Sequence, residues 1–174
     1  LDEVMIASST NLNEVAQKVT DAIAFELGFE NGVLALIDES KGVLKRVAMS
    51  NTPQGIRAKQ SLPYPYEQLE IPLSAEENIS VRAIRSGQRE ITHDLYDLFV
   101  PVFDRAFSKK IQDTVGVTTS LVYPIKARGR VMGVMIVSIA RSESQLYSYE
   151  KESIDELFDV IGVTLDNATL YSRL

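Results

Sequence analysis

His93 is the only histidine in the 174-residue sequence, and it lies beside Asp94 in the segment ITHDLYD. It could ligate a haem iron or contact a ligand at a pocket mouth, but its setting is more typical of a loop residue. A catalytic group of Ser120, His93 and Asp94 is conceivable, yet nothing places Ser120 on a nucleophile elbow. One histidine without cysteine is also a poor basis for a transition-metal site. We therefore predict no catalytic residue and no metal site, and we do not expect haem.

The sequence contains no cysteine, and this absence restricts its chemistry more than any other feature. Without a thiol there can be no disulfide, no thiolate metal site, no thiol nucleophile and no thioether-linked chromophore. Neither common Gly-rich nucleotide-binding loop is present. No cofactor is identifiable, and a covalent bilin is excluded. The absence of cysteine also fits a reducing compartment, and we expect a cytoplasmic location, although the parent protein could be membrane-anchored.

The charge balance limits the partners that the domain can have. Lys and Arg number 18 against 24 for Asp and Glu, which gives a net charge of -6. Binding to nucleic acid needs a clustered excess of Lys and Arg, so no nucleic-acid partner is expected. No apolar run approaches the ~20 residues of a membrane span, and no membrane contact by this segment is predicted.

Aromatic side chains gather in the irregular middle of the sequence. They could line a pocket around a small ligand or form a satellite core under long loops, and the pattern leaves both possibilities open. Polar residues on the central strand could likewise face the pocket or be satisfied within the sheet. The candidate ligand-binding residues are Tyr64, Tyr66, Thr92, His93, Tyr96, Phe99, Phe103, Phe107, Thr118, Ser120 and Val122.

Hydrophobic spacing predicts the elements that would position these residues. Helical periodicity begins after a cap at Asn11 and ends at Gly28. Two strands follow at 32–38 and 43–49, and a loop-like stretch with several prolines and a glycine comes next. Short strands at 69–73 and 90–92, a helix at 78–86 and a helix that stops at Gly116 occupy the middle.

The strongest strand pair is 118–125 with 131–139, joined by a turn at 126–130. The second strand is apolar at nearly every position, as expected for a strand covered on both faces in the middle of a sheet. Gly133 within it indicates a close approach of another backbone. A long helix from Ser148 completes the chain, with a coiled-coil-like spacing of apolar residues.

This order of elements resembles GAF domains over essentially the whole chain. Four segments carry the resemblance by their joint order and spacing: LNEVAQKVTDAIAFELGFENGVLALID, SVRAIRSGQREITHDL, TTSLVYPIKARGRVMGVMIVS and YSYEKESIDELFDVIGVTLDNATLYSRL. The resemblance implies an α+β fold, related to PAS domains, with a central antiparallel sheet of five or six strands. It places the terminal helices on one face and an irregular segment over a small pocket on the other.

The resemblance also implies what the domain does. GAF domains include cyclic-nucleotide sensors, bilin and haem sensors, effector-gated regulators and reductases of free methionine sulfoxide. The bilin carriers and the reductases depend on cysteine, and the Asn-Lys-Phe-Asp-Glu signature of the cyclic-nucleotide sensors is not found. Two functions remain. In the first, the domain binds an unknown small effector and relays the signal to an output module in the same chain, such as a histidine kinase. Alternatively, it is a ligand-free dimerisation or relay module of a signalling protein or transcriptional regulator.

The domain organisation follows from the same pattern. Residues 1–9 would end an N-terminal linker helix, residues 10–147 would form the core, and residues 148–174 would form a C-terminal signalling helix. The last helix has more apolar surface than one sheet face needs, and a two-fold contact would cover it economically. We therefore predict a parallel homodimer held by both terminal helices, through Leu1, Val4, Phe158 and Leu165.

Overall fold

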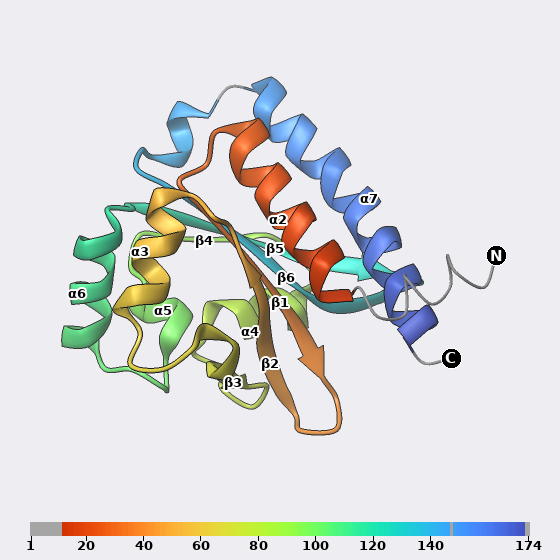
Figure 1. Ribbon diagram of the computed structural model, residues 1–174, viewed down its shortest axis with the longest axis horizontal. Helices are drawn as coiled ribbons and strands as arrows, with labels where there is room; N and C mark the ends of the chain where they lie inside the picture. Colours follow the sequence, from red (N-terminus) through yellow and green to blue (C-terminus); the bar gives the residue numbers. More distant parts are fainter. Residues whose placement is uncertain (1–11, 147, 173–174) are drawn as a thin grey trace.

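The computed structural model describes residues 12–146 and 148–172. The predicted helical segment at 1–9 and the predicted cap at Asn11 lie outside the described residues. Figure 1 shows a twisted sheet with two long helices lying side by side along it. The architecture is the predicted α+β arrangement, and each layer follows from the pattern of buried residues.

A six-stranded antiparallel sheet forms the centre of the molecule, with strand order β3-β2-β1-β6-β5-β4. The hairpin of β5 and β6 lies in its interior, because β6 pairs with β1 on one side and with β5 on the other. This confirms the prediction of a doubly covered strand mid-sheet. The strands are β1 (Asn31–Asp38), β2 (Val43–Met49), β3 (Glu70–Pro72), β4 (Glu90–Thr92), β5 (Thr119–Ala127) and β6 (Arg130–Ile139).

Gly133 permits the close pairing of β6 with β1. A Cβ atom at this position would collide with the carbonyl oxygen of Ala35 and press on Leu36. The predicted close approach of another backbone is therefore confirmed, and the neighbour is the strand that pairs directly with β6.

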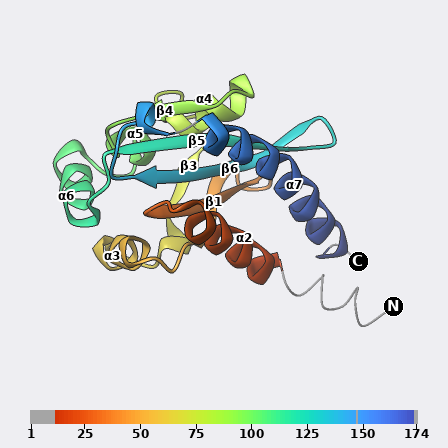
Figure 2. The same ribbon diagram turned by 90° about the horizontal axis from the view of Figure 1, so that it is seen from above.

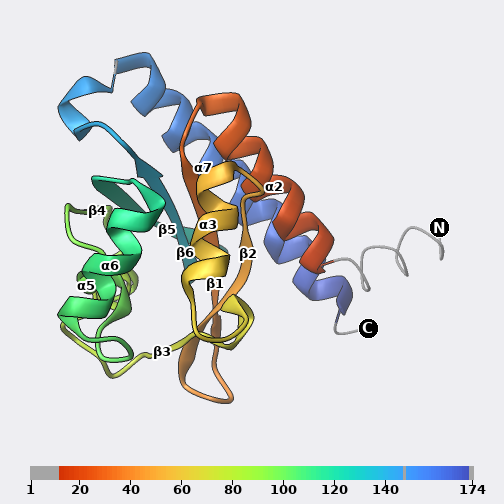
Figure 3. The same cartoon turned by 60° about the vertical axis from the view of Figure 1, so that its left-hand side comes forward.

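One face of the sheet, here called the helix face, is covered by α2 (Leu12–Leu27) and α7 (Ser148–Ser172). Figure 2 shows both helices beside the sheet, and Figure 3 shows them running next to each other. Met135, Val137 and Ile139 of β6 point to this face and pack in the same cluster as α7. The terminal helices therefore share one face, as predicted.

The opposite face, here called the cavity face, is covered by the middle of the chain. Val134 and Ile136 of β6 point to it, in strict alternation with the residues on the helix face. The covering elements are α3 (Pro53–Ser61), η1 (Tyr66–Gln68), α4 (Ile79–Ser86), α5 (Tyr96–Phe99) and α6 (Arg105–Val115), while η2 (Glu143–Gln145) connects β6 to α7. Helix α3 was expected to be a loop. It forms because the Thr52 hydroxyl accepts the backbone N–H of Gly55 and Pro53 occupies the first turn, where it is tolerated.

Candidate functional site

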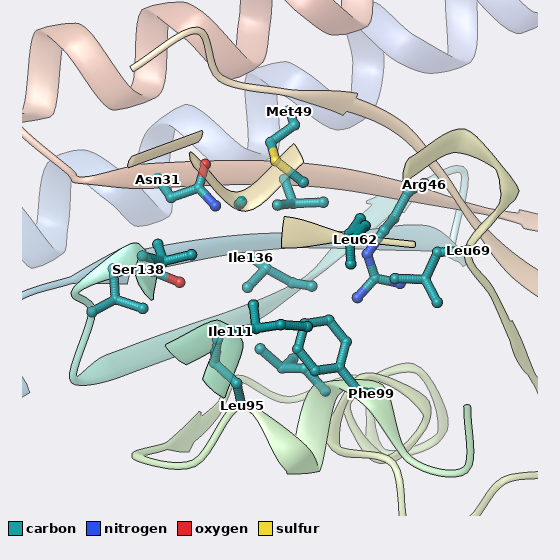
Figure 4. A pocket seen from close by; sticks show the side chains of 15 residues that line it. Asn31, Arg46, Met49, Leu62, Leu69, Leu95, Phe99, Ile111, Ile136 and Ser138 are labelled. Atoms are coloured by element: carbon teal, nitrogen blue, oxygen red, sulfur yellow. The ribbon is translucent and has the colours of Figure 1, made fainter. Parts of the chain in front are cut away.

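A cavity of about 50 Å³ lies between the cavity face of the sheet and the helices above it (Figure 4). Its floor comes from β1, β2 and β6, and its walls come mainly from α3, α5, α6 and the segments beside them. Most of the lining is aliphatic. The lining residues are Asn31, Val33, Arg46, Met49, Ala58, Leu62, Leu69, Leu95, Leu98, Phe99, Ile111, Val115, Val117, Ile136 and Ser138.

Two polar residues line one end of the cavity, Asn31 and Ser138, which are direct neighbours across β1 and β6 (Figure 4). The Asn31 Oδ1 atom accepts a hydrogen bond from the Ser50 hydroxyl at 3.0 Å. The Ser138 hydroxyl is 2.8 Å from the Ser120 hydroxyl on the neighbouring strand. The polar side chains at this end are thus tied into the sheet by hydrogen bonds.

The other end of the cavity holds a positive charge. The side chain of Arg46 reaches in from β2, and only 4% of this residue is exposed. Its guanidinium carbon lies 5.9 Å from the centre of the Phe99 ring. Burial lowers the pKa of Arg46 to about 10, partly opposed by nearby Tyr64, so the guanidinium stays protonated at neutral pH.

Arg46 has no anionic partner among the described residues. Its Nη1 atom is buried without a hydrogen bond, and the ion pairs of residues 12–146 and 148–172 do not include it. A buried charge without a partner is costly, and proteins usually pair it or coordinate it. Among the cavity-lining residues, Arg46 is therefore the one whose charge and hydrogen-bond donors most require a partner.

An irregularity in β2 aims Arg46 into the cavity. The register between β1 and β2 shifts after Leu34, so that Leu34 pairs with Ala48 and Ala35 pairs with Arg46. Val47 and Ala48 consequently both contact the helix-face cluster, whereas Arg46 and Met49 both line the cavity. In a regular strand, residues three apart point to opposite faces, so the bulge brings these two side chains together.

Two side-chain amides, one buried and one partly buried, hold the cavity walls in place. The Asn78 amide nitrogen donates to the carbonyls of Leu98 and Val100, at 3.0 and 2.8 Å. The side chain of Gln112 accepts the backbone N–H of Leu95 and donates to the Val117 carbonyl. These bonds hold the irregular segments that flank α5 and α6, so the wall has a defined shape.

Phe99 is the one predicted ligand-binding residue that lines this cavity. Phe103 and Phe107 continue from it as an edge-to-face aromatic row, with ring centres 5.3 and 5.0 Å apart. Tyr64 joins the same row. Tyr64, Phe103 and Phe107 pack against the cavity-face cluster from outside, so these three residues form a satellite core rather than the lining.

The remaining predicted positions serve other contacts. Val122 and Tyr66 are buried in the cavity-face cluster, and Ser120 bonds Ser138 within the sheet. Thr92 donates to Asp97 at 2.7 Å, and Tyr96 lies under the guanidinium of Arg105.

Two further candidates lie near the junction of β6 and η2. The Thr118 hydroxyl lies 3.4 Å from the Ile139 carbonyl. His93 is exposed and pairs with Glu143 at 2.8 Å, away from the cavity lining. Its predicted role as a loop residue fits this position.

The residues predicted for the dimer contact lie in the core of the chain's own fold. Phe158 stacks on Tyr123 with ring centres 4.4 Å apart, and Leu165 of α7 is fully buried in the helix-face cluster. Neither side chain is available to a partner in this arrangement, so the choice of these two residues requires correction. Among the described side chains of α7, at 151–169, the large exposed apolar residues are instead Val160 and Val163, which are 62% and 59% exposed. Leu1 and Val4 lie outside the described residues.

Two general features of the described residues bear on the chemistry. Within 12–146 and 148–172, no cluster of three or more His, Cys, Asp or Glu side chains could hold a metal ion. No helix in this part of the chain is long and apolar enough to cross a membrane.

A six-stranded antiparallel sheet with paired terminal helices on one face and a small cavity on the other defines a class of sensory and regulatory domain. The sequence model of the GAF domain matches residues 9–166, and the chain belongs to the GAF family. No curated protein sequence matches the chain. GAF domains are ligand-binding sensory or regulatory domains of signalling proteins and are in general not catalytic.

Solved structures with the same fold come from several kinds of protein. A methyl-accepting chemotaxis protein (residues 122 to 287) is 16% identical with a TM-score of 0.67, covering 94% of this chain and 93% of that one. The second GAF domain of DevS from Mycobacterium smegmatis is 18% identical, with a TM-score of 0.61 and coverage of 93% and 98%. A type II free methionine-R-sulfoxide reductase from Thermoplasma acidophilum is 13% identical, with a TM-score of 0.56 and coverage of 89% and 94%. At these identities the similarity concerns the fold alone.

Proposed function

We propose that this GAF domain is a non-catalytic sensor that binds a small effector in the cavity lined by Arg46 and Phe99. It relays binding through α2 and α7 to an output module in the same chain, such as a histidine kinase. The observation that carries this proposal is the position of the cavity. It lies between the sheet and a separate layer of helices, on the face opposite α2 and α7.

Strand β6 supplies a direct mechanical link between the two faces. Ile136 lines the cavity, and its chain neighbours Met135 and Val137 are fully buried against the helix face. A ligand that displaces Ile136 must therefore move side chains that contact the terminal helices, because the interior is packed too closely to absorb the shift. A small displacement of packed helices is a common form of switching.

The proposal is tested by filling the cavity from α3. Ala58 lines the cavity, whereas Gln60 on the same helix is exposed, so Ala58→Met and Gln60→Met form a matched pair. The purified domain is heated with and without a fractionated mixture of small metabolites. We expect at least one fraction to raise the melting temperature of wild type and Gln60→Met, but not of Ala58→Met. A ligand at 100 times its Kd stabilises by about 2.7 kcal/mol, which shifts melting by several degrees.

The opposite result would favour the second candidate function. If no fraction affects wild type, or if Ala58→Met responds equally, the cavity is not an effector site. The domain would then act as a ligand-free relay, and its assembly would become the functional property. Val160 and Val163 support this alternative, because they lie three residues apart on one exposed face of α7, and contiguous apolar surface of this kind is typical of contacts between chains. Phe25 on the neighbouring α2 is also exposed. We propose a homodimer through this helix surface in either case.

A further inference from the structure

The unpaired charge of Arg46 restricts the chemistry of any ligand in the cavity. The guanidinium presents planar hydrogen-bond donors, and in the part of the chain that the structure describes no carboxylate meets them. Two aromatic residues lie near it: the ring centre of Phe99 is 5.9 Å from the guanidinium carbon, and Tyr64 lies close enough to affect the charge. A ring face offsets part of the cost of a buried cation, but it does not satisfy the donors.

The side chains around the Arg46 guanidinium restrict the shape of the ligand as well as its charge. Leu62, Leu69 and Phe99 lie around the guanidinium in Figure 4, and Ile136 lies between it and the polar end of the cavity. A ligand must therefore combine an acceptor group at one end with an apolar body at the other. A carboxylate matches the guanidinium fork with two parallel hydrogen bonds, and such pairs are strongest where water is excluded.

The volume limits the size of the ligand. An apolar cavity of roughly 150 Å³ holds benzene, and this cavity has only about 50 Å³. By the same comparison the cavity has about one third of the volume that holds benzene, so the smallest carboxylic acids are already at its limit, and a longer alkyl chain enters only where the walls move apart.

We propose that the effector is a short-chain carboxylic acid, bound as its anion with the carboxylate on the Arg46 guanidinium and the alkyl chain against Ile136 and Phe99. This inference rests on the proposed effector site and specifies the chemical class of its ligand. In the empty domain the buried charge of Arg46 lowers the stability of the fold, and in the bound domain its hydrogen bonds to the carboxylate provide most of the binding specificity.

Sodium propionate and neutral propionamide form the test pair, because they share size and shape but differ in charge. Each is titrated into the 15N-labelled domain at constant ionic strength, and backbone amide shifts are followed for Asn31, Phe99, Ile136 and Ser138. We expect saturable shifts with propionate and an affinity for propionamide at least tenfold weaker. Formate, acetate and butyrate extend the series and locate the best chain length.

Variants of β2 separate binding from folding. Arg46→Met keeps the length of the side chain without its charge, and we expect a loss of propionate affinity of tenfold or more. The adjacent Lys45→Met removes a partly exposed charge from the same strand and should bind propionate like wild type. Without ligand, Arg46→Met should melt at the same temperature as wild type or higher, because removal of an unpaired buried charge does not destabilise. Arg46→Lys, which retains the charge, should fold and bind with intermediate affinity.

The outcomes distinguish this inference from the proposed function. Equal binding of propionate and propionamide would overturn the carboxylate assignment and leave the effector site in place. A large loss of stability in Arg46→Met would show that the arginine has a structural role and would also overturn the assignment. If no acid of the series shifts the cavity amides, the inference fails, and the metabolite experiment with Ala58→Met then decides independently whether the cavity binds anything.

Discussion

The buried guanidinium of Arg46 lowers the stability of the empty fold, and in the proposed complex it would bind the ligand. A Leu or Met at this position would complete the apolar lining and would avoid the desolvation of a charge. Residues that lower the stability of the empty state are typical of binding sites, because their cost is recovered only when a ligand arrives. The proposed ligand would therefore account for a side chain that the packing of the core does not explain.

His93 illustrates a residue with a local electrostatic effect far from the cavity. Its Nε2 atom lies 2.8 Å from Glu143, and this hydrogen bond is the main cause that lowers the pKa of Glu143 below its ordinary value of 4.5. A carboxyl group whose pKa is lower in the folded than in the unfolded chain stabilises the fold at pH values above the unfolded-state pKa. This stabilisation is lost as the pH falls through the folded-state pKa. The pair should therefore weaken below about pH 4.5, by a small amount because it is exposed.

We predict that His93→Ala raises the pKa of Glu143 toward 4.5. The side-chain carboxyl resonance of Glu143, followed by NMR from pH 7 to pH 2, measures this directly. Arg105→Ala, which breaks a different surface ion pair with Asp94, serves as the control and should leave Glu143 unchanged. An ordinary pKa for Glu143 in wild type would contradict the pairing.

At the scale of elements, α7 approaches the sheet unusually closely at one point. Gly162 lies in the middle of this helix, and a Cβ atom there would collide with the carbonyl oxygen of Lys126 at the end of β5. The contact is with backbone, which cannot rotate away as a side chain could. The missing side chain therefore sets the distance between helix and strand.

Gly162→Ala should destabilise the domain by about 1–3 kcal/mol through overpacking, even though helix propensity alone would favour alanine by about 1 kcal/mol. Urea unfolding at pH 7 measures the net effect. Val163→Ala, at the exposed neighbouring position, should change stability by less than the glycine replacement. A more stable Gly162→Ala variant would mean that α7 can lift from β5 at no cost.

Most elements could be predicted because their signals are local. The strands at 118–125 and 131–139 follow from apolar runs around a turn, and Gly87 and Gly116 end their helices with positive φ angles of 68° and 81°. Helix α3 was missed because Pro53 and Gly55 resemble loop residues when the cap at Thr52 is not considered. The glycine is needed because a side chain there would collide with the Ser50 carbonyl oxygen.

The cavity lining was predicted poorly for a different physical reason. The aromatic residues of the middle segment are numerous, yet of these only Phe99 reaches the cavity. Tyr64, Phe103 and Phe107 pack on one another. Tyr66 is buried in the cavity-face cluster, and Tyr96 lies under Arg105. Arg46 was missed because alternation along VLKRVAM does not reveal which face is buried, and the bulge at Val47 changes the alternation. Side-chain direction after a bulge depends on pairing with a strand elsewhere in the chain.

At the scale of the whole molecule, the exposed apolar surface of α7 bears on the oligomeric state. We predict that the domain forms a homodimer at micromolar concentration and that Val160→Glu combined with Val163→Glu dissociates it without unfolding. Both residues are exposed on α7, so charges there should disturb only a contact between chains. Sedimentation velocity measures the mass, and circular dichroism verifies the fold.

Ile56→Glu is the matched control for the dimer experiment, because Ile56 is an exposed apolar residue on α3 rather than α7. It should leave the dimer intact. Phe158→Glu should instead unfold the domain, since its side chain is buried against Tyr123. A wild-type domain that is strictly monomeric under these conditions would refute the homodimer.

The alternation along β6 has a practical consequence for protein engineering. Its even-numbered positions Val134, Ile136 and Ser138 face the cavity side, and its odd-numbered positions Met135, Val137 and Ile139 face the terminal helices. Under the proposed function, ligand specificity and signal transmission would depend on two interleaved sets of positions within this one strand. A combinatorial library that varies only the even set could be selected for new ligands while the response machinery is inherited unchanged, and a library of the odd set could retune the response for a fixed ligand.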